Sequence, residues 1–181
     1  DASAVKSEDL NALGEVSCPV YFALGNHERY IDLDAAIAMI SSKGVDLLRS
    51  QAMIHGQLQI VGIDDADNPD HVGNNLPGIE LSDHHYRILL YPRPDGWQAA
   101  RRAGIDLMLA GHTHGGQIWP FNHVVRQRFK YLTGLFSEDG RHLYVSPGTG
   151  CWGPVMRLGT RSEMTVINLV PATAAGGANA S

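Results

Sequence analysis

Two short motifs hold most of the side chains in this chain that could do chemistry. The first is GNHE at residues 25–28, and the second is GHTHGG at residues 111–116. Each follows an apolar run with the composition of a β-strand, at residues 19–24 and 105–110. In open α/β sheets, functional groups collect where the strands end, and a glycine there lets the chain turn sharply. The motifs are therefore predicted to bring an amide, a carboxylate and three imidazoles to one edge of a sheet.

His112 and His114 are separated by a single residue. In extended backbone this spacing points both rings to the same face, with their Cα atoms roughly 6.5 Å apart. Rings so placed can serve neighbouring ions of a two-metal centre, which lie about 3.5–4 Å apart. Each motif taken alone has a plainer interpretation: a pair of surface histidines, a turn asparagine or an ordinary loop histidine.

The two motifs in this order, each placed after a strand, resemble those of the calcineurin-like metallophosphoesterases. Residues 105–117 and 144–153 look like a bacterial branch of that superfamily, whose members often carry N-terminal membrane segments. The resemblance covers residues 1–169. It implies a mixed α/β fold, a β-sandwich of two sheets flanked by helices. It also implies hydrolysis of phosphate esters by two divalent transition-metal ions, which would be manganese, iron or zinc.

The resemblance further implies roles for individual residues. Asn26 would bind one ion through its amide oxygen, and His112 and His114 would bind one ion each. His27 would bind no metal but would meet the phosphate and protonate the leaving oxygen. Asp1 would be the carboxylate that orients this catalytic histidine.

The chain also departs from the superfamily pattern, and each departure removes a metal ligand. No Asp-x-His motif and no leading Gly-Asp precede Asp1, and we expect a more complete chain to carry them. The strand at residues 86–91 is followed by Pro92, where the pattern has a histidine, and proline has no side-chain donor atom. His84 and His85 lie at the other end of that strand, roughly 23–26 Å away, so they cannot substitute. We therefore expect at most one weakly held ion.

Arg93 follows the lost histidine position directly. It is a candidate for binding the substrate phosphate, and an exposed loop arginine is an equally good interpretation.

A second basic group lies at residues 125–131, where the alternation predicts a strand with Arg126, Arg128 and Lys130 on one face. Trp119 and Phe121 precede it. This surface could contact an anionic membrane or a lipid-like substrate. The favoured interpretation is an ordinary half-buried strand with a solvated basic side.

The remaining pattern indicates one α/β domain at residues 1–170 and a disordered tail at residues 171–181. A long polar loop is expected at residues 64–83. Helices are predicted at residues 7–15, 32–43 and 95–103, and further strands at residues 45–48, 52–55, 57–63, 133–136, 142–145 and 164–169.

Composition narrows the classes of partner. The chain has 181 residues, 44% of them hydrophobic, with 14 Lys and Arg against 19 Asp and Glu. This acidic balance argues against nucleic acid as a partner. No apolar run is long enough to span a bilayer, so the chain as given is predicted to be a soluble domain. Only the resemblance suggests a membrane-associated parent protein.

Two functions remain open at this point. The first is an enzyme that hydrolyses a phosphate mono- or diester with a metal-activated water, acting on a small or lipid-like phosphate ester. The second is a non-catalytic domain of the same fold, which binds a ligand but has lost hydrolysis through Pro92 and the missing motifs. The oligomeric state is not predicted.

Overall fold

A computed structural model describes residues 6–30 and 32–171 of the chain. The candidate catalytic residue Asp1 lies outside the described residues. So does the predicted C-terminal tail, apart from its first residue.

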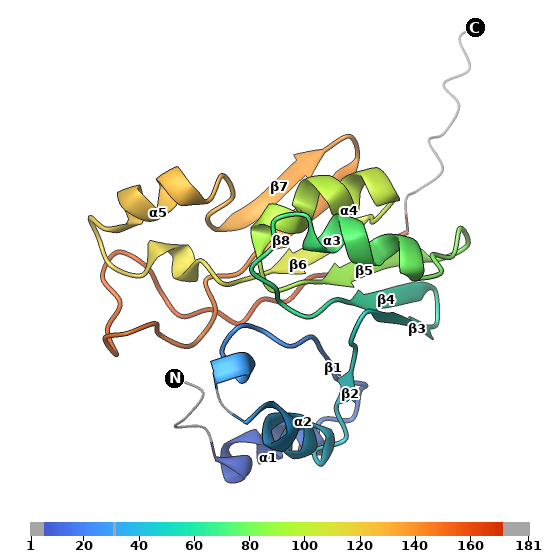
Figure 1. The fold of residues 1–181 in the computed structure, drawn as a ribbon, viewed down its shortest axis with the longest axis horizontal. Helices are drawn as coiled ribbons and strands as arrows, with labels where there is room; N and C mark the ends of the chain where they lie inside the picture. Colours follow the sequence, from blue (N-terminus) through green and yellow to red (C-terminus); the bar gives the residue numbers. More distant parts are fainter. Residues whose placement is uncertain (1–5, 31, 172–181) are drawn as a thin grey trace, which may run out of the picture.

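The fold is built on a six-stranded mixed sheet in the order β3-β4-β5-β6-β8-β7 (Figure 1). The four central strands run parallel, and the two edge strands pair antiparallel with their neighbours. A small second sheet pairs β1 with β2 in parallel. The strands are β1 (Tyr21–Phe22), β2 (Asp46–Leu47), β3 (Gln51–His55), β4 (Leu58–Gly62), β5 (Tyr86–Leu90), β6 (Leu107–Ala110), β7 (Gly134–Glu138) and β8 (Arg141–Val145).

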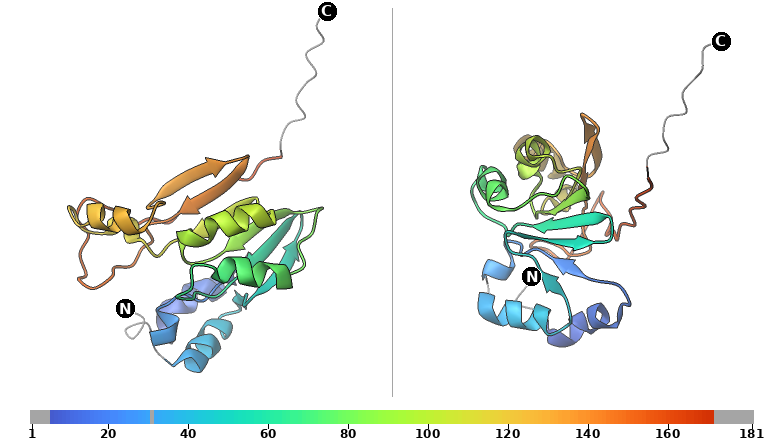
Figure 2. Two further views of the ribbon diagram at one scale, coloured as in Figure 1. Left: turned by 45° about the horizontal axis from the view of Figure 1, so that its top comes forward. Right: turned by 90° about the vertical axis from the view of Figure 1, so that its right-hand side faces the viewer.

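Helices and the small sheet cover the two faces of the large sheet (Figure 2). Helices α3 (His71–Asn75) and α4 (Trp97–Ala103) lie on one face. The small sheet lies on the other face, with α1 (Asn11–Glu15) and α2 (Leu33–Ser41) beyond it. The predicted arrangement of two sheets flanked by helices is therefore confirmed.

Alternation along the central strands supplies both buried faces. In β5, Leu89 packs into the cluster under α3 and α4, whereas Ile88 packs toward the small sheet. In β6, Met108 and Leu107 divide in the same way. Parallel strands must be covered on both faces, which explains why residues 88–90 of β5 and all of β6 are apolar. The prediction that the apolar runs at residues 86–91 and 105–110 form buried strands is therefore confirmed.

The segment at residues 125–131 is not the predicted strand. It lies largely in helix α5 (Asn122–Arg128), and Phe129 is the residue that ends the helix. An apolar spacing of four residues fits a helix as well as a strand, and Val125 and Phe129 both line the same pocket. The alternating pattern at residues 125–131 therefore fitted both a strand and a helix. In the structure it forms a helix, with Val125 and Phe129 packed at the pocket.

Two further expectations about elements are wrong. The predicted strand at residues 164–169 has no regular secondary structure, because within the described residues no strand pairs with it. The predicted loop at residues 64–83 contains α3 and a short 3-10 helix at Leu76–Gly78. Val72, Leu76 and Ile79 are buried at helical spacing inside it, a signal that the polar composition hid.

Polar side chains connect α4 to the edge of the large sheet. The Tyr131 hydroxyl donates to Glu138 Oε1 (2.7 Å), and Gln98 Nε2 donates to Glu138 Oε2 (3.0 Å). Lys130 Nζ lies 3.6 Å from Glu138 Oε1. The hydrogen bonds from Tyr131 and then Gln98 are the main reasons why the pKa of Glu138 falls to about 2.

We predict that Glu138→Gln lowers the melting temperature at neutral pH but not in acid. The folded-state pKa of Glu138 is about 2 against an ordinary value of 4.5, so its stabilisation is complete above the ordinary value. That stabilisation is lost as the pH falls toward the folded-state value. Thermal unfolding across this range measures the effect, with Glu80→Gln as the control at an exposed carboxylate. A constant difference between wild type and variant at all pH values would contradict the prediction.

Candidate functional site

The two sequence motifs meet at one pocket of about 480 Å³, next to the carboxyl end of β6. The predicted site residues Asn26, His27, Arg93, His112 and His114 all line it. The rest of the lining is largely apolar and includes Tyr30, Ile118, Phe121, Val125, Phe129, Trp152 and Pro154. The pocket therefore combines polar and apolar lining.

The GNHE motif leaves the small sheet two residues after β1 and turns immediately. Glu28 Oε2 accepts a hydrogen bond from the backbone N of Gly25 (2.7 Å), which closes the turn. Asn26 Oδ1 then lies 3.2 Å from Nδ1 of His112, a residue far away in the sequence. The ring of His27 packs edge-on against Tyr30, with 5.9 Å between centroids. The turn thus presents the amide and an imidazole to the same space.

The GHTHGG motif is not in the extended backbone that the spacing of its histidines suggested. His112 and His114 have φ values of 68° and 50°, in the left-handed region that non-glycine residues rarely adopt. Thr113 between them is buried, and its Oγ1 donates to the carbonyl of Leu132. The chain coils as soon as β6 ends, yet both rings still reach the pocket. Backbone strain of this kind is typical of functional sites.

Burial favours the neutral form of both rings by lowering their pKa. Burial lowers the pKa of His112, and the positive charge of Arg93 lowers it further. Burial is also the main cause of the lowered pKa of His114. Neutral imidazole is the form that binds metal ions. Nδ1 of His114 is buried and has no hydrogen-bond partner among the described residues, so this nitrogen is available to bind a metal ion.

The donors present suit one ion better than two. Asn26, His112 and His114 offer one oxygen and two nitrogen donors, a set that suits zinc, manganese or iron. Among residues 6–30 and 32–171, no cluster of three or more His, Cys, Asp or Glu side chains could hold a metal ion.

Pro92 lies beside the second motif. Its carbonyl accepts a hydrogen bond from the backbone N of Gly111 (2.8 Å), which places it next to His112 across neighbouring strands. A histidine at position 92 would stand at the same edge of the sheet as His112. Proline leaves that position without a donor atom.

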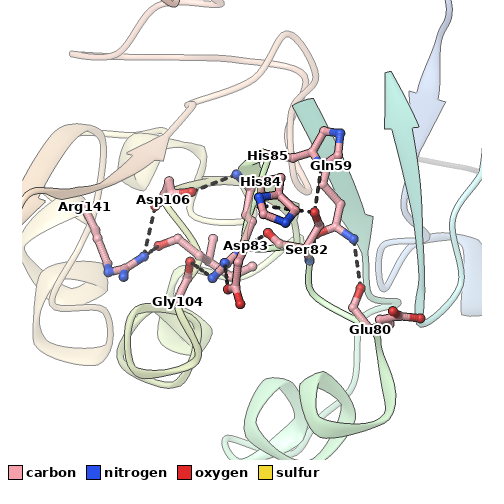
Figure 3. Close-up of polar contacts among 11 residues, drawn as sticks. Gln59, Glu80, Ser82, Asp83, His84, His85, Gly104, Asp106 and Arg141 are labelled. Carbon is pink, nitrogen blue, oxygen red and sulfur yellow. Dashed lines mark hydrogen bonds and ion pairs between the residues drawn. The ribbon is translucent and has the colours of Figure 1, made fainter. Parts of the chain in front are cut away.

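His84 and His85 lie before β5 begins, whereas Pro92 follows the end of that strand. Nδ1 of His85 is 2.7 Å from Oγ of Ser82, within the group of polar contacts drawn in Figure 3. Asp106 belongs to the same group and accepts from the guanidinium of Arg141 (3.1 Å). These histidines are therefore part of a structural network at the opposite end of the sheet.

Arg93 lines the pocket, but two of its three guanidinium nitrogens are bound by carboxylates. Its Nε and Nη2 donate to Asp65, and Nη2 also donates to Asp67. Arg29 donates to Asp65 as well. The carboxylate of Asp65 is fully buried, and its backbone N donates to the carbonyl of Leu24 (2.8 Å). Asp65 thus fixes Arg93 in the wall of the pocket.

Sequence reasoning missed Asp65 and a second supporting residue, Arg157. Asp65 follows the apolar run of β4 as the two motifs follow theirs, and that position was the available signal. Arg157 donates to the carbonyls of His114 (3.1 Å) and Pro147 (2.8 Å) and to that of Gly150. No pattern around it marks this role.

Comparison with known proteins finds several metallophosphoesterases. An uncharacterized metallophosphoesterase of Campylobacter jejuni is 33% identical over 82% of this chain and 41% of its own length. Phosphodiesterase YaeI of Escherichia coli is 32% identical over 91% of this chain and 63% of its own length. A bovine transmembrane protein with a metallophosphoesterase domain is 33% identical over 82% of this chain and 38% of its own length.

The chain therefore spans between about two fifths and two thirds of these curated relatives. No protein-family model and no solved structure matches it. Within the described part of the chain, no helix has the length and apolar character needed to cross a bilayer.

Replacing Asp65 should destabilise the fold far more than replacing Asp67. Asp65→Ala leaves two arginines beside an empty buried position, and removing one partner of such a pair costs about 3 kcal/mol. The side chain of Asp67 contacts the same two arginines but is 75% exposed, so its loss should matter much less. Urea unfolding of both variants measures the difference. Equal losses would show that Asp65 does not anchor this wall.

Proposed function

Because the chain belongs to the calcineurin-like metallophosphoesterase superfamily, we propose that it hydrolyses a phosphate mono- or diester with a metal-activated water. The observation that carries this proposal is the convergence of the two motifs on one pocket. Side chains that are far apart in the sequence place an amide oxygen and three imidazoles around a space large enough for a phosphate ester. Packing alone does not require that these polar side chains all face the same pocket.

In this proposal, Asn26, His112 and His114 hold a divalent transition-metal ion. The bound ion would neutralise the phosphate charge and lower the pKa of a bound water toward neutrality. The chain prepares the site in two ways. Burial keeps both histidine rings neutral, and Phe129 packs edge-on against His112 with 5.6 Å between centroids. The ligands are thus pre-oriented for a metal ion.

His27 is proposed to protonate the leaving oxygen. It lines the pocket beside Asn26, and among the described residues no hydrogen bond joins its ring to His112 or His114, so the ring is available to the substrate. Arg93 is proposed to bind a phosphate oxygen. Its Nε and Nη2 are committed to carboxylates, whereas Nη1 has no hydrogen-bond partner among the described residues. Asp1 remains a candidate for orienting His27.

One observation favours the alternative, a non-catalytic domain of the same fold. Pro92 stands beside Gly111 at the edge where the superfamily pattern has a histidine ligand. Without a ligand at position 92, two imidazoles and one neutral amide oxygen remain, and they leave coordination positions of a bound ion open to solvent. Metal binding and turnover therefore distinguish the two functions.

Restoring a ligand at position 92 should strengthen both metal binding and hydrolysis. We expect the dialysed chain to hold at most about one transition-metal ion, because three donors support no second site. In a chain that carries an Asp-x-His and a Gly-Asp motif before Asp1, Pro92→His should tighten binding and raise hydrolysis of bis(p-nitrophenyl) phosphate by at least about tenfold, since even indirect partners of a metal contribute roughly 10–100-fold. Metal analysis and nitrophenolate release with added Mn²⁺ measure the two effects.

Pro92→Ala is the matched control, because it removes the proline ring without adding a donor. Hydrolysis in neither wild type nor Pro92→His would favour the non-catalytic function. Two tightly held ions in the wild-type chain would contradict the ligand count.

The roles of His27 and His112 are separable by two substitutions. His27→Asn should retain metal and slow turnover by roughly 10²–10⁴, the usual range for a general acid. The loss should be greater for esters with poor leaving groups, which need the proton, than for nitrophenyl esters. His112→Asn should lose metal first and slow all substrates alike. Metal content and rates for an alkyl and an aryl ester are the measurements, in whichever background at position 92 supports turnover. Metal loss in His27→Asn would mean that the acid is assigned to the wrong histidine.

A further inference from the structure

The rim of the pocket is formed by two segments that are bound to each other. Gln117 and Trp152 exchange two hydrogen bonds, from Trp152 N to Gln117 Oε1 (2.6 Å) and from Gln117 Nε2 to Trp152 O (2.8 Å). Trp119 N donates to the carbonyl of Leu158 (2.8 Å), and Leu158 N donates to that of Gln117 (2.9 Å). The segments preceding α5 and following β8 therefore form one continuous surface at the pocket mouth. Figure 1 and the left view of Figure 2 show both at the end of the molecule where α5 lies.

Large apolar side chains are exposed on this surface. Trp119 and Trp152 are 58% and 59% exposed, and Val155 is 97% exposed. Phe121, Val124 and Met156 are also about half exposed. Single exposed apolar residues need no explanation, but a group around the mouth of a pocket is typical of an interaction site. Tryptophan is the residue type favoured at the interface between water and a bilayer.

The charge of the same surface is opposite to that of the whole chain. The chain carries a net charge of -5, yet no Asp or Glu lies between Asp106 and Glu138 or between Asp139 and Glu163. All the exposed apolar residues of the rim fall within these acid-free stretches. Arg126, Arg128 and Lys130 lie in or just after α5 and are exposed. Arg126 forms no ion pair with a described residue, and Arg128 has only one at 4.0 Å.

We propose that this rim binds the surface of an anionic phospholipid bilayer, with the aromatic and aliphatic side chains inserted and the arginines of α5 among the lipid headgroups. Basic residues near an anionic surface attract it, and apolar side chains gain by leaving water. The pocket then opens toward the bilayer. Resting on the proposed function, this orientation assigns the substrate class: a phosphate ester carried by an amphiphile in the membrane.

Sedimentation with vesicles tests the proposal without any need for metal or turnover. We expect the chain to bind vesicles of phosphatidylcholine with one third phosphatidylglycerol, and to bind pure phosphatidylcholine much more weakly. Raising the salt to about 1 M should weaken binding, since the screening length falls to about 3 Å. Equal binding to both vesicle types, or to neither, would overturn the proposal. Binding to neither would favour a protein as the occupant of this surface.

Matched variants assign binding to the rim. Arg126→Gln should weaken vesicle binding about fivefold, as expected for one cation at an anionic surface. Arg102→Gln removes another exposed arginine, from α4, and should have no effect. The double variant V124S/V155S should weaken binding by about tenfold through lost apolar burial, whereas V16S/I54S, at exposed sites just after α1 and on β3, should not.

All six exchanges in these four variants are at exposed positions outside the pocket, and circular dichroism checks the folding of each variant. Equal effects of rim and control variants would show nonspecific adsorption and overturn the assignment. Vesicle binding by a chain that hydrolyses nothing would uphold the lipid surface while rejecting the proposed function, so the two failures are distinguishable.

Discussion

The parallel register of four central strands is the constraint on which the rest of the structure depends. Parallel strands end at the same edge, and each needs apolar cover on both faces. Hydrogen bonds continue beyond the strand ends, from Ile63 N to Leu90 O, from Gly111 N to Pro92 O and from Ser146 N to Ala110 O. These contacts hold the starts of the loops after β4, β5, β6 and β8 in place relative to one another. The position of the pocket is therefore decided by backbone pairing before any polar side chain contributes.

The polar side of the pocket depends on a second constraint, the burial of Asp65. A fully buried carboxylate needs partners, and Arg29 and Arg93 both supply them. Arg93 in turn lowers the pKa of His112, because a nearby positive charge disfavours a second one. Thus one buried acid, placed where β4 ends, both orders a guanidinium at the pocket wall and helps to keep a candidate ligand neutral. The same arginine would otherwise be a mobile loop residue.

The sequence predicted those features that one local pattern determines. The apolar runs became β5 and β6, and the motifs after them converge as expected. Predictions failed where a local pattern was ambiguous or where a distant partner decides. The alternation at residues 125–131 fitted the period of a strand and also that of a helix. In the structure the segment is largely helical and packs against the pocket. The run at residues 164–169 lacks a pairing strand among the described residues. Asp65 and Arg157 matter through long-range contacts: only the position of Asp65 after the β4 run hinted at its role, and no pattern marks Arg157.

The distribution of charge separates the chemistry of the pocket from the character of its rim. The polar part of the pocket is close to balanced, since two arginines pair with two carboxylates and burial favours the neutral form of both candidate ligand rings by lowering their pKa. The acidic residues of the chain are absent from both rim segments, although the chain as a whole is acidic. A pocket for a free, water-soluble phosphate ester needs no exposed tryptophans at its mouth, and exposing them costs solubility. A pocket that receives its phosphate from a bilayer needs both features of this rim, apolar side chains to enter the interface and cations to meet the headgroups. Under the proposed bilayer contact, the segments that form the mouth thus specify the class of substrate, which the two sequence motifs do not.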